Sequence, residues 1–152
     1  MTRVSSPLHL QGFLPYQLSI LQNRVSAFVG AYYKKHLKMS RNEWRAMAAL
    51  AQHGERSAKE IGHFVQLEKM PVSRALKALV SKGFVQQSTD AEDKRLSRLE
   101  LTPEGVDIYQ DILPHVLKGQ DEVLAVLSEK EQQDLEYLLE KLLRHSETLA
   151  QE

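Results

Sequence analysis

The stretch EKMPVSRALKALVSKGFVQQSTDAEDKRLSRLELT, residues 68–102, decides the fold. Its first half predicts a helix over about 69–82, because Val72, Leu76 and Leu79 recur at helical spacing and form one apolar face. Pro71 suits the first turn of a helix, where its missing N–H is not needed. Gly83 stands where a helix commonly ends in a left-handed residue. We therefore predict a short amphipathic helix with a sharp stop.

A β-hairpin is predicted to follow this helix directly. Strands are expected at 84–88 and 96–101, and the second shows alternation in Leu99 and Leu101. The seven residues 89–95 between them form a charged loop. Thr102 followed by Pro103 is a helix N-cap, so the hairpin is predicted to lead straight into another helix.

The flanking segments are predicted to be helical. Apolar residues at helical spacing predict one long helix from about Pro15 to Leu37, and Pro114 is expected to kink the helix that Thr102 opens. Three further helix starts carry a Ser-x-x-Glu capping box, in which the Ser hydroxyl and the Glu carboxylate satisfy backbone donors reciprocally. These boxes are Ser40–Glu43, Ser57–Glu60 and Ser128–Glu131.

The order of these elements predicts a winged helix-turn-helix, in a chain that is mainly α-helical with a small β-hairpin wing. The helices of this unit are predicted at 57–65 and about 69–82. In a winged helix-turn-helix the second of the two helices enters the DNA major groove. The exposed side of the helix at 69–82 carries short polar groups and cations but no acid. Arg74 is the best candidate for a guanine edge, while Ser57 and Lys59 are placed to meet the DNA backbone. The full set of predicted DNA contacts is Ser57, Lys59, Lys69, Met70, Pro71, Ser73, Arg74, Lys77, Lys94, Arg95 and Arg98.

The loop of the hairpin has its own predicted role. Arg95 and Lys94 are its cations, and the negative potential of the adjacent minor groove attracts arginine. Asp90 and Asp93 are interpreted as local partners that hold the loop in shape, with Asp93 able to pair with Arg95 or with a basic residue of the helix-turn-helix. Because an exposed ion pair contributes little stability, its value would lie in positioning.

The charge is zero overall but strongly polarised. Residues 1–99 carry 16 Lys and Arg against 7 Asp and Glu, whereas residues 100–152 carry 4 against 13. This distribution predicts a basic surface for an anionic partner and an acidic region facing away, although chance clustering of solvated charges remains an alternative. No apolar run approaches the ~18 residues of a membrane span and no signal-peptide pattern is seen, so a cytoplasmic protein without membrane contact is expected.

Residues 72–105 resemble the MarR family of bacterial transcriptional regulators. The family shows V-S-R on the recognition helix, a D-x-x-D-x-R wing and a closing L-x-L-T-x-x-G. All three occur here, as Val72–Arg74, Asp90–Arg95 and Leu99–Gly105. Two departures are mild: Lys94 stands where many members have Arg, and Glu68 where many have Asp. The resemblance implies that Arg95 enters the minor groove and that Asp93 organises the wing.

The resemblance also implies a homodimer. A single domain over 1–152 would divide into a winged helix-turn-helix DNA-binding lobe at 38–102 and a helical dimerisation region at 8–37 and 103–152. Broad apolar stripes on the first and last helices agree, because a compact winged core cannot cover them. Two-fold symmetry would set two recognition helices roughly 34 Å apart, on a palindromic site. The expected function is that of a homodimeric repressor.

MarR-like proteins often bind a small aromatic or phenolic effector between the dimer helices and the DNA lobe. Tyr33, His36, Trp44 and Arg45 are candidates to line such a pocket, with Arg45 taking a carboxylate. The alternative is that Trp44 belongs to the core and that Arg45 contacts a phosphate.

Other classes are less well supported. The chain has no cysteine and no HExxH motif, so neither a metal site nor a cofactor is predicted. Nothing resembles a nucleophile elbow or a phosphate-binding glycine loop, so an enzyme is not predicted. A winged-helix protein-interaction module without DNA readout is the alternative function, and the basic recognition helix argues against it.

Overall fold

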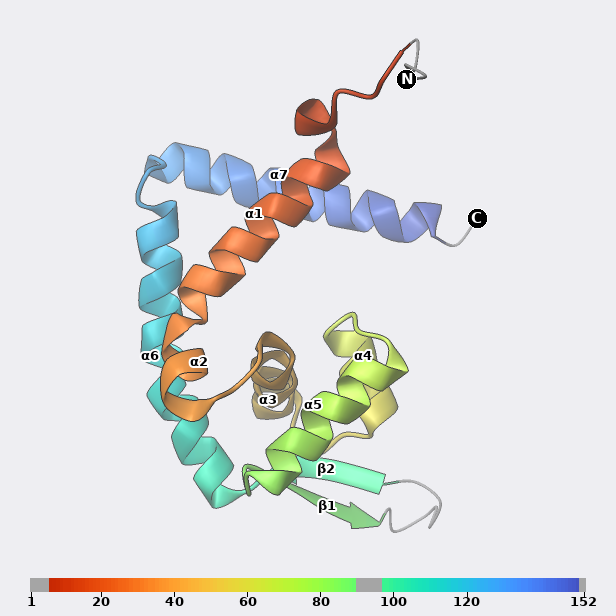
Figure 1. The fold of residues 1–152 in the computed structure, drawn as a ribbon, viewed down its shortest axis with the longest axis vertical. Helices are drawn as coiled ribbons and strands as arrows, with labels where there is room; N and C mark the ends of the chain where they lie inside the picture. The colour runs from red at the N-terminus through yellow and green to blue at the C-terminus, as the bar shows by residue number, and fades with distance from the viewer. Residues whose placement is uncertain (1–5, 90–96, 151–152) are drawn as a thin grey trace, which may run out of the picture.

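The computed structural model describes residues 6–89 and 97–150. Within these ranges the chain forms one 3-10 turn, seven α-helices and an antiparallel hairpin (Figure 1). The prediction of a mainly helical fold with a β-hairpin wing is confirmed. In chain order the elements are η1 (Leu10–Gly12), α1 (Leu14–Val29), α2 (Ala31–Leu37), α3 (Arg41–His53), α4 (Ala58–Phe64), α5 (Lys69–Ser81), β1 (Val85–Thr89), β2 (Ser97–Leu101), α6 (Pro103–Leu124) and α7 (Glu129–Leu149).

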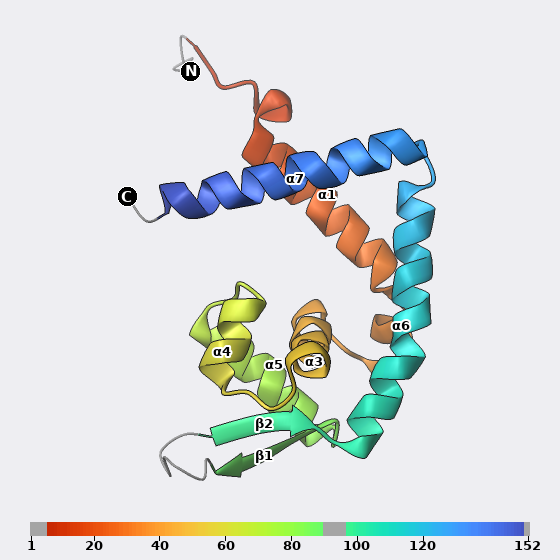
Figure 2. The ribbon, with the colours of Figure 1, turned by 180° about the vertical axis from the view of Figure 1, so that it is seen from behind.

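Two regions are distinct in space. Helices α3, α4 and α5 gather beside the hairpin, while α6 runs along one side of the molecule from the hairpin to α7 (Figures 1 and 2). Helix α1 packs on α6, and α7 turns back across the end of the molecule that lies farthest from the hairpin. Within the described ranges, no helix has the length and apolarity needed to cross a membrane.

The hydrophobic core lies mainly in the lobe that contains the helix-turn-helix. Its largest fully buried side chains are Met39, Met47, Ile61, Leu79 and Ile112, the last contributed by α6. By contrast, α1 and α7 are described in full and neither has a buried residue. The core therefore holds α3, α4, α5 and the hairpin as one body with the start of α6, and leaves the outer helices exposed.

The predicted helix signals are confirmed. Each of the three Ser-x-x-Glu segments forms a complete capping box. Gly83 has a φ of 76°, and the N–H of Phe84 donates to the carbonyl of Leu79 at 3.0 Å, which is the Schellman stop expected after α5. Thr102 caps α6 by accepting from the N–H of Gly105 at 3.0 Å.

The prediction of a single helix from Pro15 to Leu37 is wrong. The chain bends at Gly30, whose ψ of 2° departs from the helical value, and α1 and α2 lie on either side of it. The Tyr33 side chain folds back onto this position, where a Cβ would lie 2.3 Å from its hydroxyl oxygen. Glycine therefore permits a close approach that another residue would block. At Pro114, α6 continues and ends only at Leu124.

The hairpin is joined to the helix-turn-helix through a third segment. Strands β1 and β2 pair with Val85 opposite Leu101 and Thr89 opposite Ser97. On the other edge of β2, Leu99 exchanges two backbone hydrogen bonds with Arg56, of 2.8 and 2.9 Å. Since Arg56 directly precedes the cap of α4, the base of the wing is held at the start of the helix-turn-helix.

Candidate nucleic-acid interface

Helix α5 has one apolar and one polar face. Val72, Ala75, Leu76 and Leu79 are buried against the core. Among the predicted contacts of this helix, Pro71 and Ser73 are half-buried, and the others are exposed, namely Lys69, Met70, Arg74 and Lys77. Because the helix contains no acidic residue, this exposed face can approach an anionic surface without charge repulsion.

Several predicted DNA contacts surround one hollow. A cavity of about 850 Å³ lies between α4 and the start of α5, and its lining includes Lys59, Lys69 and Ser73 together with apolar Leu67 and Val72. Pro71 and Arg74 line a smaller hollow of about 190 Å³ on the α3 side of the same helix. The structure thus brings the predicted residues of α4 and α5 to adjacent positions.

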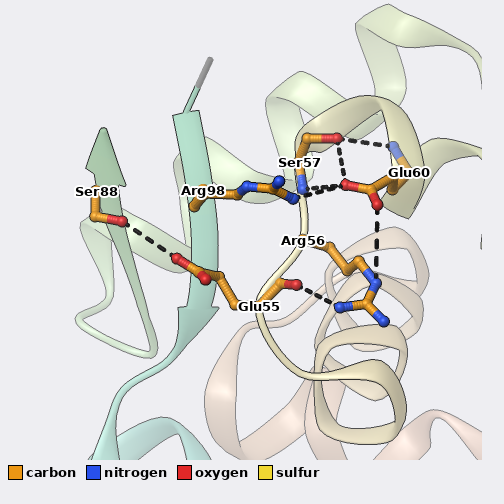
Figure 3. A network of polar contacts seen from close by, with 6 residues as sticks. All are labelled: Glu55, Arg56, Ser57, Glu60, Ser88 and Arg98. Atoms are coloured by element: carbon orange, nitrogen blue, oxygen red, sulfur yellow. Dashed lines mark hydrogen bonds and ion pairs between the residues drawn. The ribbon is translucent and has the colours of Figure 1, made fainter. Parts of the chain in front are cut away.

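Ser57 has a structural role at the start of α4. Its Oγ accepts from the N–H of Glu60 at 3.3 Å, and its own N–H and hydroxyl donate to the Glu60 carboxylate at 2.8 and 2.7 Å (Figure 3). These hydrogen bonds hold the pKa of Glu60 below its ordinary value of 4.5, because they favour the charged carboxylate.

Arg98 has a protein partner at the same place. Its Nη1 donates to Glu60 at 3.2 Å, so this predicted DNA contact is engaged by a carboxylate (Figure 3). Arg56 approaches the other oxygen of Glu60 at 4.0 Å. Sequence reasoning assigned Glu60 only a capping role, because a pair between residues 38 apart leaves no local pattern.

Lys82 is a second residue that the sequence did not single out. Its ammonium forms an ion pair with Glu43 and donates to the carbonyl of Lys38 at 3.0 Å. Glu43, only 7% exposed, also accepts from the N–H of Ser40 as part of the α3 capping box. Lys82 therefore ties the end of the recognition helix to the start of α3 and fixes its orientation.

The predicted contacts and organisers of the wing loop, Asp90, Asp93, Lys94 and Arg95, lie outside the described residues. The described strands on either side of this segment pair as far as Thr89 and Ser97.

Three of the four candidate effector residues line one cavity. Tyr33, Trp44 and Arg45 border a hollow of about 400 Å³ between α1, α3 and α6, which Val116 also lines. His36 is not among its lining residues, and instead its ring lies 4.8 Å from that of Tyr32. The structure therefore separates His36 from the other three.

Trp44 and Arg45 also have structural contacts. The indole stacks between Tyr33 and Tyr109, with ring centroids 5.7 and 5.4 Å apart. Arg45 donates to the carbonyl of Val65, which follows the end of α4. Trp44 and Arg45 thus contact the core and also border the cavity. Burial raises the pKa of the Tyr33 phenol, which lines the same cavity.

The chain is similar to known DNA-binding proteins and transcriptional regulators. The winged helix DNA-binding domain family matches residues 39–105. An uncharacterised HTH-type transcriptional regulator of Staphylococcus aureus is 32% identical over 83 residues, which are 55% of this chain and 57% of that protein. The chain therefore spans little more than half the length of this relative.

Solved structures match over nearly the whole chain. A MarR-family transcriptional regulator from Silicibacter pomeroyi is 29% identical with a TM-score of 0.74, covering 92% of this chain and 96% of that one. BpsR of Bordetella bronchiseptica, whose DNA binding is regulated by 6-hydroxynicotinic acid, has a TM-score of 0.81 at 20% identity, covering 90% and 97%. The named relatives are regulators rather than enzymes, in agreement with the sequence-based prediction.

Proposed function

We propose that this chain is a winged helix-turn-helix transcriptional regulator of the MarR family, which binds a palindromic promoter site as a homodimer and represses transcription by occluding it. The observation that carries this proposal is the burial pattern of α5. This helix has no acidic residue, its cationic face is exposed, and its apolar face is buried in the core. A rigid helix of this kind fits the DNA major groove.

The proposed DNA contacts fall into two kinds. Arg74 and Ser73 on α5 would meet base edges, and Lys59 and Lys69 beside the same cavity would meet phosphates. Lys77, one turn beyond Ser73 on the exposed face, would reach a phosphate or a base. Base contacts supply sequence specificity, whereas phosphate contacts supply position and salt-dependent affinity.

The proposed partner for the outer helices is a second copy of this chain. Leu138, Leu142 and Leu143 form an apolar stripe on α7 and are 54, 48 and 64% exposed. Leu21 and Phe28 on α1 are also exposed. Monomeric proteins rarely leave contiguous apolar patches of this kind in water. A two-fold dimer through these helices would set two α5 helices about one turn of DNA apart.

We propose that a small aromatic acid binds the cavity lined by Tyr33, Trp44 and Arg45. Its aromatic wall suits a planar ring, and Arg41 and Arg45 on its border suit a carboxylate. The regulation of BpsR by 6-hydroxynicotinic acid supports testing this chemical class. The cavity is lined both by the outer helices and by the lobe that carries α5. A bound ligand would therefore act by favouring one spacing between the DNA-binding lobes of the two protomers.

The effector proposal can be tested by fluorescence. Trp44 is the only tryptophan in the chain, so its emission reports directly on the cavity. Titration with aromatic acids such as salicylate and 6-hydroxynicotinate should quench it saturably and release bound DNA over the same concentration range. Saturable quenching without release of DNA would assign the cavity a ligand but no regulatory role.

The DNA-binding proposal is tested by selecting bound sequences from a random duplex pool and titrating the winner at two salt concentrations. The expected result is a palindrome with half-sites about one helical turn apart and an affinity that falls with salt. A promoter-reporter assay then separates repression from activation. Weak binding without sequence enrichment would favour the protein-interaction module instead.

A further inference from the structure

We propose that Glu60 is a positioning residue for DNA binding, whose carboxylate holds Arg98 and thereby fixes the base of the wing against the start of α4. This inference rests on the proposed function, because it assigns a role within DNA binding. It also reassigns Arg98, which the sequence alone predicts to be a DNA contact, as an internal link between β2 and the helix-turn-helix.

Two arginines from different segments meet at one carboxylate. Arg98 of β2 donates to Glu60 at 3.2 Å, and Arg56 lies 4.0 Å from the other carboxylate oxygen (Figure 3). Arg56 is itself the backbone partner of Leu99, the neighbour of Arg98 on β2. A backbone bridge and a side-chain bridge therefore connect adjacent residues of β2 to the segment that begins α4.

A similar link reaches the other strand of the wing. The hydroxyl of Ser88 on β1 donates to the carboxylate of Glu55 at 3.4 Å, and Arg56 donates to the carbonyl of Glu55 at 2.6 Å (Figure 3). Both strands thus contact residues 55–60. These polar contacts lie beside the buried Val85 and Leu99, which pack the base of the hairpin on the core, and they add a link to α4 from the exposed side of the wing.

Stability alone is a poor explanation for Glu60. Its side chain is 45% exposed, and ion pairs at such exposure contribute little to stability. An acid beside Ser57 and Lys59 would also repel the DNA backbone. The negative charge of Glu60 favours DNA binding if it orients the wing. Removing the charge would then lower the DNA affinity, because losing the orientation of the wing costs more than ending the repulsion gains.

The chain contains a matched control for the capping role. Glu131 closes the capping box of α7 with the same three contacts to Ser128, at 2.8, 2.8 and 3.4 Å. The pKa of Glu131 is lowered by the same hydrogen bonds. Glutamine at this position of a capping box preserves the cap. Glu60→Gln therefore removes the charge that holds Arg98, and Glu131→Gln makes the same change on α7, which crosses the end of the molecule away from the hairpin (Figure 1).

The test measures DNA affinity and amide exchange in the full-length chain. We expect Glu60→Gln and Arg98→Gln each to weaken binding to the selected duplex about tenfold, and the double variant to bind no more weakly than either single variant, as for residues that act as one unit. Glu131→Gln should bind as wild type. The amide of Leu99 should exchange faster in Glu60→Gln, while the melting temperatures of Glu60→Gln and Glu131→Gln agree.

The opposite results separate the explanations. Tighter binding by Glu60→Gln would mean that the acid only repels DNA, and additive losses would mean that Arg98 contacts DNA independently of Glu60; either result overturns the inference and leaves the proposed function standing. If the wild-type chain fails to select any duplex, the proposed function fails and the role in DNA binding fails with it. Leu99 exchange then still reports whether Glu60 holds the wing.

Discussion

At the residue scale, the arginines of the DNA-binding lobe serve different purposes although the sequence makes them look alike. Arg98 is held by Glu60, and Arg45 donates to the carbonyl of Val65. Arg74 is exposed on the polar face of α5. Counting basic residues therefore overstates the cationic surface available to DNA, and Arg74 stays our proposed base-reading residue.

We predict that Arg74→Ala weakens binding to the selected duplex by about 1–3 kcal/mol and relaxes specificity at one base position per half-site. The fold should be intact, because the side chain is exposed. Affinities for the selected duplex and for single-base variants measure both effects. Lys130→Ala, at the start of α7, is the control. An equal loss on every duplex would reduce Arg74 to a phosphate contact, and no loss would remove α5 from the groove.

At the element scale, the wing and α6 meet through a glycine. Thr102 caps α6, its N–H donates to the carbonyl of Phe84 at 3.1 Å, and its hydroxyl donates to the carbonyl of Gly83 at 2.6 Å. This arrangement brings the first turn of α6 directly beneath Phe84. A Cβ at Gly105 would lie 1.9 Å from the Phe84 carbonyl oxygen. The long helix can therefore leave the wing at this angle only with glycine at position 105.

We predict that Gly105→Ala destabilises the chain by about 1–3 kcal/mol, because the methyl group displaces backbone and not a flexible side chain. At an exposed helical position, the same change from glycine to alanine would stabilise the chain, since alanine is about 1 kcal/mol more favourable than glycine in a helix. Urea unfolding midpoints measure the change. Gly119→Ala, where the new Cβ would lie 3.2 Å from the Val29 Cα, should be less destabilising. Equal effects at the two sites would contradict the proposed steric cause.

At the scale of the whole molecule, the helix-turn-helix lobe buries its apolar side chains, whereas the outer helices leave many of theirs exposed. The helix-turn-helix lobe has its own buried core, whereas α1 and α7 expose apolar stripes at the end away from the hairpin (Figures 1 and 2). The excess of acidic residues in 100–152 belongs to α6 and α7. The acidic C-terminal third of the chain thus extends away from α5, as the charge distribution predicts for a DNA-binding protein.

We predict that replacing both Leu138 and Leu142 with Asp yields monomers, because the charges would have to be buried in the dimer interface. Light scattering should give about half the wild-type mass, and the affinity for the palindrome should fall steeply while that for a half-site changes little. Gln133→Asp, at an exposed position on the opposite side of α7, should leave the dimer intact. A dimer that survives the double substitution would place the interface elsewhere.

Sequence patterns alone determined the winged helix-turn-helix, because its signals are local. The capping boxes at Ser40, Ser57 and Ser128, the stop at Gly83 and the spacing on α5 each depend on residues only a few positions apart. Physical rules for helix ends apply to such segments whatever surrounds them. The contacts assigned to the wing loop stay predictions, since 90–96 lie outside the described residues.

Tertiary structure decided what the polar side chains do. Glu60 meets Arg98 across 38 positions and Glu43 meets Lys82 across 39, and no local pattern encodes either pair. The bend at Gly30 depends on where the Tyr33 ring folds, and the cavity at Trp44 on where α1 and α6 pack. These features arise only when distant segments compete for the same space and the same charges, which is why the sequence placed helix α5 correctly but gave no sign of the contact between Glu60 and Arg98.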